Sequence, residues 1–172
     1  MFKLNDTILY GTHGACRIAG VTTKDFSGRP VDYYELKPVY NEKSTIYVPV
    51  GNQALEDKMR RILSPEEIYE IIQCIPDEEA DWIENEDERK ERYRQILSGG
   101  NRIELVKIIK ALYLHQREQQ AKGRRLHASD ERFFKDAEKM LYDEFALVLN
   151  IKPEQVLPFI MEQIQIEKKE GR

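Results

Sequence analysis

The charged residues between positions 77 and 125 form two adjacent blocks of opposite sign. Asp77–Glu88 contains eight acids and no base, whereas Arg89–Arg125 contains eleven bases and three acids. The formal net charge of −4 for the whole chain conceals this pattern. A concentrated basic segment is typical of a protein that contacts a polyanion such as nucleic acid.

The single tryptophan, Trp82, lies inside the acidic block. Beside nucleic acid, a tryptophan can act as a wedge or as a stacking surface for bases. In a folded core it is a packing anchor, because tryptophan is usually buried over most of its surface. The neighbouring carboxylates would be repelled by phosphates. Both roles, DNA wedge and packing residue, therefore stay open for Trp82.

The bases of the second block have two possible roles. They either form local ion pairs, such as Lys90 with Glu86, or contact phosphates. Because three acids cannot neutralise eleven bases within the segment, we favour phosphate contacts, which position a protein without reading sequence. The candidate DNA-binding residues are Trp82, Arg89, Lys90, Arg92, Arg94, Lys107, Arg124 and Arg125.

The sequence lacks the residue patterns that are typical of phosphate-binding loops, of acid–base catalysis and of metal sites. The glycines between residues 11 and 28 do not have the spacing of a phosphate-binding loop. The acids of 77–88 are consecutive, without the two distinct environments that general acid–base catalysis uses. Cys16 and Cys74 are isolated and the three histidines are scattered, so no metal site is predicted. We expect no enzymatic activity, no cofactor, no metal and no small-molecule substrate.

Two further features concern the location of the protein. No apolar run approaches the roughly 18 residues that a membrane helix needs. Residues 1–10 lack the charged and apolar regions of a secretory signal. We therefore expect a cytoplasmic protein without a membrane partner.

Residues 1–63 are predicted to form a small antiparallel β-barrel. Short runs of β-branched and aromatic residues alternate with glycine-containing turns, which is typical of such a barrel. Alternate residues share one face of a strand, as in the pairs Ile8/Tyr10, Tyr34/Leu36 and Ile46/Val48. The four predicted strands cover residues 6–10, 15–21, 31–39 and 45–50.

Residues 64–172 are predicted to form a compact all-α bundle, which makes the fold class α+β. Ser64, Pro65 and Glu67 form a capping box that starts the first helix, and Pro76 ends it. Asn101 and Ser129 are expected to cap two later helices. Apolar residues at helical spacing predict helices at about 65–75, 86–97, 102–120 and 130–149, and from 153 onward.

The opening residues carry a recognisable pattern. Phe2–Gly14 resembles the start of the CarD/CdnL family of bacterial transcription factors, and the same module resembles the polymerase-interacting domain of transcription-repair coupling factors. Tyr34–Lys37 and Ile46–Pro49 match two strands of the family pattern. Tyr93–Gly99 and Leu105–Leu112 follow its helical half, so the resemblance covers nearly the whole chain.

The resemblance implies a Tudor-like barrel, residues 1–63, that binds the β subunit of RNA polymerase. It also implies a helical domain, residues 64–172, that contacts promoter DNA at the upstream edge of the transcription bubble, where a family tryptophan enters the minor groove. Such a protein regulates transcription by modulating the stability of the open complex. The alternative is a protein-only adaptor that docks on polymerase or another partner without contacting DNA.

The resemblance also implies residue roles. Lys24 matches one of two basic polymerase contacts, and Tyr47 stands at the other, where arginine is common. Tyrosine keeps contact area but loses the bidentate charge of arginine. Counting back from Tyr93, the family tryptophan falls near Glu86, about four residues after Trp82. This departure leaves the packing role for Trp82 open.

Overall fold

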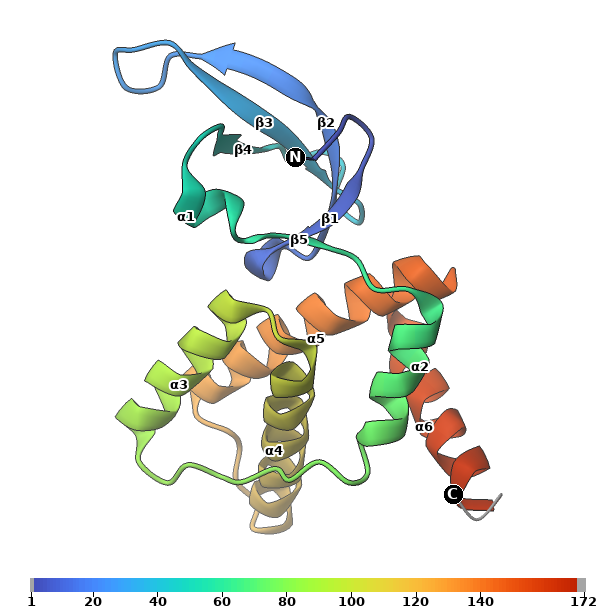
Figure 1. The fold of residues 1–172 in the computed structure, drawn as a ribbon. Coiled ribbons are helices and arrows are strands. Elements are labelled where there is room, and N and C mark those ends of the chain that lie inside the picture. Colours follow the sequence, from blue (N-terminus) through green and yellow to red (C-terminus); the bar gives the residue numbers. More distant parts are fainter. Residues whose placement is uncertain (1, 170–172) are drawn as a thin grey trace. The chain divides into compact units, whose positions relative to one another are not determined.

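A computed structural model describes residues 2–169, which group into two compact units that divide between Ile62 and Leu63 (Figure 1). The first unit holds a five-stranded sheet and the second holds helices, so the predicted α+β class is confirmed. The elements of the first unit are β1 (Thr7–Tyr10), a 3₁₀ turn (Gly11–His13), β2 (Ala15–Lys24), β3 (Val31–Pro38), β4 (Ile46–Pro49), α1 (Gln53–Glu56) and β5 (Met59–Arg61).

The sheet is antiparallel, with strand order β4-β3-β2-β1-β5. The predicted barrel is wrong, because β4 and β5 form the two edges and do not pair with each other within residues 2–169. Residues 53–56 form the short helix α1, which lies against β4. Its Leu55 packs on the core of the unit.

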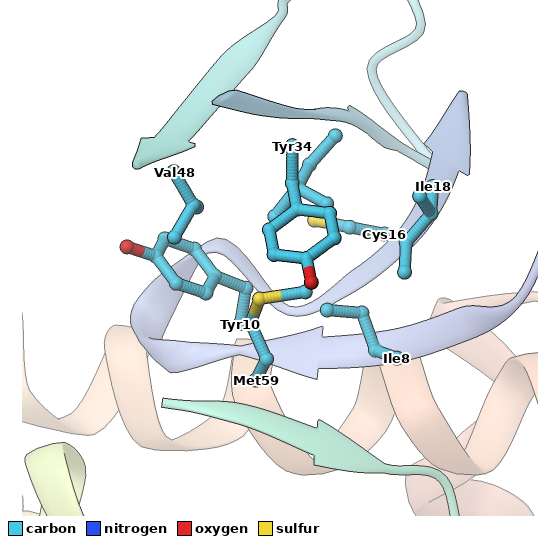
Figure 2. Packing of buried hydrophobic residues seen from close by; sticks show 8 residues of the cluster. Ile8, Tyr10, Cys16, Ile18, Tyr34, Val48 and Met59 are labelled. Atoms are coloured by element: carbon cyan, nitrogen blue, oxygen red, sulfur yellow. The ribbon is translucent and has the colours of Figure 1, made fainter. Parts of the chain in front are cut away.

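The core of this unit lies on one face of the sheet (Figure 2). Side chains alternate across a strand, so Tyr34 and Leu36 point inward while Tyr33 and Glu35 face the other way. The residues of the predicted same-face pairs pack in this core, together with Met59 from the unpredicted β5; they are Ile8, Tyr10, Tyr34, Leu36, Ile46 and Val48. The opposite face of β2, β3 and β4 remains at the surface.

The second unit contains the five predicted helices. The capping box is present, because Ser64 accepts from the Glu67 amide and Glu67 accepts from the Ser64 amide. Asn101 caps its helix as predicted, and Gly100 ends the preceding helix at a positive φ of 66°, which favours glycine. The helices are α2 (Pro65–Cys74), α3 (Glu86–Gly99), α4 (Arg102–Ala121), α5 (Ala128–Leu149) and α6 (Pro153–Lys169).

Helix α5 contributes residues to both apolar clusters of this unit. Its first half, including Ala137 and Met140, packs with α3 and α4. Its second half, including Phe145, packs with α2, α4 and α6. Within residues 2–169, no helix is long and apolar enough to cross a membrane.

The predicted cap at Ser129 is wrong. Helix α5 begins at Ala128 and its N-cap is His127, without a side-chain cap. Ser129 therefore lies inside the first turn, where its hydroxyl is buried and has no hydrogen-bond partner in the part of the chain that the structure describes. The next residue, Asp130, is buried in the same first turn and accepts two hydrogen bonds from Arg89 of α3.

Candidate functional site

Three aromatic rings form a cluster on the outer face of the sheet. Phe26, in the loop after β2, lies with its ring centroid 5.3 Å from Tyr33 and 5.5 Å from Tyr47. The Tyr33 and Tyr47 rings are 6.3 Å apart and nearly perpendicular. We call Phe26, Tyr33 and Tyr47 the aromatic patch. Phe26 is 62% exposed, which is unusual for a phenylalanine that packs on other rings.

The sequence-predicted pair Lys24 and Tyr47 lies together at this patch. Strand β3 lies between β2 and β4 and pairs with both, so Lys24 of β2 reaches Tyr47 of β4 across β3. The Lys24 ammonium is 5.9 Å from the centroid of the Tyr47 ring, within the range of a cation–π contact. Exposed aromatic residues with a basic neighbour are typical anchors of protein–protein interfaces.

Trp82 is half-buried and packs against the α3–α4–α5 cluster. Its ring stacks on His115 of α4, with centroids 3.7 Å apart and planes 8° from parallel. The Arg89 guanidinium lies 4.5 Å from the Trp82 centroid. The indole is therefore an anchor that attaches the acidic block to α3 and α4, and a role as a DNA wedge would require it to leave these contacts.

This stack predicts the fluorescence behaviour of Trp82. We expect acrylamide to quench the native protein about twofold less than the unfolded protein, because His115 and Arg89 screen the ring. His115→Ala should raise quenching of the folded protein toward the unfolded value. Gln116→Ala, at the next position of α4, serves as the control. Equal quenching of the native and unfolded wild type would contradict the stacked arrangement.

Arg89, a predicted DNA contact, is an internal structural residue. It is only 3% exposed, and its Nε and one terminal nitrogen each donate to an Asp130 carboxylate oxygen at 2.8 Å. Its other terminal nitrogen donates to the backbone carbonyls of Ile83 at 2.9 Å and Glu84 at 3.4 Å. These bonds use four of the five guanidinium N–H donors, and the buried side chain is not accessible to a phosphate.

The two neighbouring bases of α3 carry local ion pairs. Lys90 lies 2.8 Å from Glu86, and this hydrogen bond lowers the pKa of the Glu86 carboxyl. Arg94 lies 3.6 Å from Glu91, and both side chains are 64% exposed. Exposed pairs of this kind contribute little to stability and exchange readily with other partners. Arg94 is therefore accessible to a phosphate, whereas Lys90 is half-buried and closely paired.

Two further predicted contacts, Arg92 and Lys107, line one cavity of about 280 Å³ between α3, α4 and the acidic block. Arg92 pairs with Glu104 at 3.2 Å. Lys107 lies 3.5 Å from Glu78, which belongs to the acidic block, and 3.8 Å from Glu104. Acids that are distant in sequence thus neutralise part of the basic block.

Arg124 and Arg125 differ from the other predicted contacts. They follow the end of α4 beside Lys122, and all three side chains are exposed. None of the three makes a side-chain hydrogen bond or ion pair with any residue whose side chain the structure describes. Their charge is available to a partner.

Residues 75–78, which lead into the acidic block, are attached to α4 through their backbone. The Lys110 ammonium donates to the carbonyl oxygens of Ile75, Pro76 and Glu78, at 3.1, 3.2 and 2.9 Å. Together with the Arg89 bonds, this contact holds a segment without regular secondary structure against two helices. The segment is therefore an integral part of the helical unit.

Comparison with known families identifies both units. Residues 2–63 match the CarD-like/TRCF RID domain, and residues 68–161 match the CarD C-terminal domain. The chain belongs to the CarD family. Proteins of the CarD family are transcription factors that interact with RNA polymerase. The aromatic patch lies in the CarD-like/TRCF RID domain, and the stacked Trp82 lies in the CarD C-terminal domain.

Sequence reasoning missed three residues of these CarD-family sites. Tyr33 was detectable, because strand alternation puts it on the face opposite Tyr34. Phe26 lies in a loop, and no periodicity predicts its direction. Asp130 gave no signal as the partner of Arg89, because the two lie 41 positions apart.

Proposed function

We propose that this CarD-family chain regulates transcription by binding the β subunit of RNA polymerase with its sheet unit and promoter DNA with its helical unit. The second contact lies near the upstream edge of the bubble and changes the stability of the open complex. The observation that carries the proposal is the aromatic patch, with its exposed Phe26 and half-buried Tyr33 and Tyr47, beside Lys24 in the unit that matches the CarD-like/TRCF RID domain.

Two features of the sheet unit support a polymerase contact. The aromatic patch offers rigid apolar anchors, and Lys24 adds a charge that an acidic partner surface would complement. The sheet is also open, so an edge strand is available for pairing with a strand of the partner. The aromatic anchors favour the outer face of β3 and β4 as the principal contact.

On the DNA side, the exposed cations are the proposed contacts. Arg124 and Arg125 have no internal partner among the described side chains, and Arg92, Arg94 and Lys107 have exposed pairs that a phosphate can replace. Arg89 and Lys90 are assigned to the internal structure instead. Trp82 is assigned to holding the acidic block, through its stack on His115. Phosphate contacts alone make the interaction independent of sequence.

The proposed mechanism joins these two weak contacts. Binding to polymerase raises the local concentration of the helical unit at the promoter, so a few phosphate contacts suffice. The helical unit then shifts the equilibrium between the closed and the open promoter complex. The size of this shift is set by the difference between its affinities for the two complexes. Binding to free DNA is accordingly expected to be weak and strongly dependent on salt.

Reversing the charge of Arg124 and Arg125 tests the DNA contact. In Arg124→Glu/Arg125→Glu, we expect the open-complex lifetime to return to the value without the protein, because two phosphate contacts become repulsive. The slope of log affinity for forked promoter DNA against log salt should fall by about 2, as expected for two lost contacts. Lifetime is measured by competitor challenge of polymerase–promoter complexes.

Two controls make this result specific. Lys152→Glu, an exposed charge reversal before α6, should leave the open-complex lifetime as in wild type. Binding to isolated polymerase should be unchanged in all variants. If the wild-type protein binds polymerase but never alters the lifetime, the protein is an adaptor without DNA contact. Loss of polymerase binding in Arg124→Glu/Arg125→Glu would equally contradict the assignment.

A further inference from the structure

A second cavity of the helical unit, of about 180 Å³, lies between α4, α5 and α6. Its walls are largely apolar, with Ile109 from α4, Leu141 from α5 and Ile160 from α6. Leu157 and Met161 of α6 line it and are 44% and 49% exposed, so the cavity is open to solvent. It shares no lining residue with the aromatic patch or with Arg124 and Arg125.

Three aromatic side chains and one carboxyl group stand out in this lining: Tyr113, Phe134, Tyr142 and Glu138. Burial raises the pKa of the Glu138 carboxyl. Glu138 makes no hydrogen bond or ion pair with any residue whose side chain the structure describes. Glu138 is half-buried in this apolar wall, so its carboxyl group is a site for a cation or a donor from outside.

Lys110, the basic residue of the lining, is not the partner of the Glu138 carboxyl group. Lys110 lines the cavity, but its ammonium group donates to the carbonyls of Ile75, Pro76 and Glu78. Three acceptors use all three donors of an ammonium group. Arg117 lies with its guanidinium 5.7 Å from the Tyr113 ring and donates to the Tyr113 hydroxyl. Glu138, Phe134 and Tyr142 therefore remain for a ligand.

We propose that this cavity binds a small organic ammonium ion whose apolar body contacts the walls and whose charge faces Glu138. Aromatic rings attract cations through their negative faces, and Phe134 and Tyr142 line the same cavity. Burial raises the pKa of the Tyr142 phenol, so this ring stays neutral beside the carboxylate. A cavity of about 150 Å³ accommodates benzene, so the present volume suits one ring with a short chain.

The test uses two ligands that share a phenethyl body and differ in the terminal group, which is a charged ammonium in one and a neutral hydroxyl in the other. Phenethylammonium and its neutral analogue 2-phenylethanol are titrated into ¹⁵N-labelled full-length protein at pH 7, and shifts of the backbone amides are followed. We expect phenethylammonium to bind with a Kd on the order of 1 mM, as suits so small a ligand. It should bind at least fivefold more tightly than 2-phenylethanol, with shifts concentrated on α5 and α6 beside the cavity.

Variants test whether the preference for phenethylammonium depends on the Glu138 carboxyl group. Glu138→Gln keeps the shape of the side chain and should bring the two ligands within twofold of each other. Glu131→Gln, on the same helix but outside the cavity, should keep the wild-type preference. Met161→Trp, at an exposed position of the lining, should abolish binding of both ligands. Equal binding of the two ligands to the wild type, an unchanged preference in Glu138→Gln, or no saturable shifts would overturn the proposal.

Discussion

Replacing Arg89 with alanine is expected to lower the free energy of unfolding of the helical unit by about 3–5 kcal/mol, the usual effect of removing one partner of a buried ion pair. Asp130 is fully buried and takes both 2.8 Å hydrogen bonds from Arg89. Without the guanidinium, a carboxylate would remain in an apolar environment. The carbonyls of Ile83 and Glu84 would also lose their donor.

Urea unfolding followed by tryptophan fluorescence measures this effect, because the single tryptophan, Trp82, reports on the helical unit alone. Arg94→Ala removes an exposed pair on the same helix and should change stability by less than about 0.5 kcal/mol. Arg89→Met/Asp130→Leu removes both charges and should recover most of the loss. A stable Arg89→Ala protein would contradict the internal role of this arginine.

The buried pair also determines which charge reversals are informative about DNA. In Arg89→Glu, the new carboxylate would repel Asp130 inside the helical unit. A loss of promoter activity in this variant would therefore report unfolding rather than a lost DNA contact. Arg124 and Arg125 avoid this difficulty, because their side chains are exposed and pack against none of the described core residues. The reversal experiment is therefore confined to these two positions.

Replacing Tyr47 with alanine is expected to weaken binding to the polymerase β subunit by about 30-fold, or about 2 kcal/mol, as for an aromatic interface hot spot. This expectation rests on the proposed polymerase contact. Tyr47 packs with Phe26 and Tyr33 and lies below the Lys24 ammonium, so its removal would leave the other rings of the aromatic patch without support. Titration calorimetry with the isolated β subunit measures the change.

Two tyrosine variants serve as controls for Tyr47→Ala. Tyr47→Phe keeps the ring and should stay within about threefold of wild type, because the contribution is mainly apolar area. Tyr40→Ala, an exposed tyrosine that lies between β3 and β4, should bind like wild type. Unchanged affinity in Tyr47→Ala would exclude the aromatic patch as the polymerase contact.

Local patterns predicted much of the secondary structure. Alternation along β1, β3 and β4 identified the residues that pack in the core, because successive side chains in a strand face opposite ways. The capping box at Ser64, the cap at Asn101 and the glycine at position 100 define helix ends by contacts within a few residues. The opening motif Phe2–Gly14 indicated the family, which the comparisons confirmed.

The open sheet was not predictable in the same way. The strand β5 is a three-residue segment, Met59–Arg61, without alternation or β-branched residues, and it forms by pairing with β1. The short helix α1 lies against β4 and covers the core with Leu55. Such short elements depend on the surface they pack against rather than on their own propensity.

The two charge blocks show which properties the sequence predicts and which depend on the tertiary structure. The sequence by itself determined the order of the four longer strands and the five helices of the second unit, the family, and the reversal of charge after Glu88. Only the tertiary structure decided which charges remain free, since Arg89 finds Asp130 and Lys107 finds Glu78 across long separations in the chain. It also decided that Trp82 stacks on His115. Ion pairing and stacking depend on distance in space, which a local count of charges does not contain.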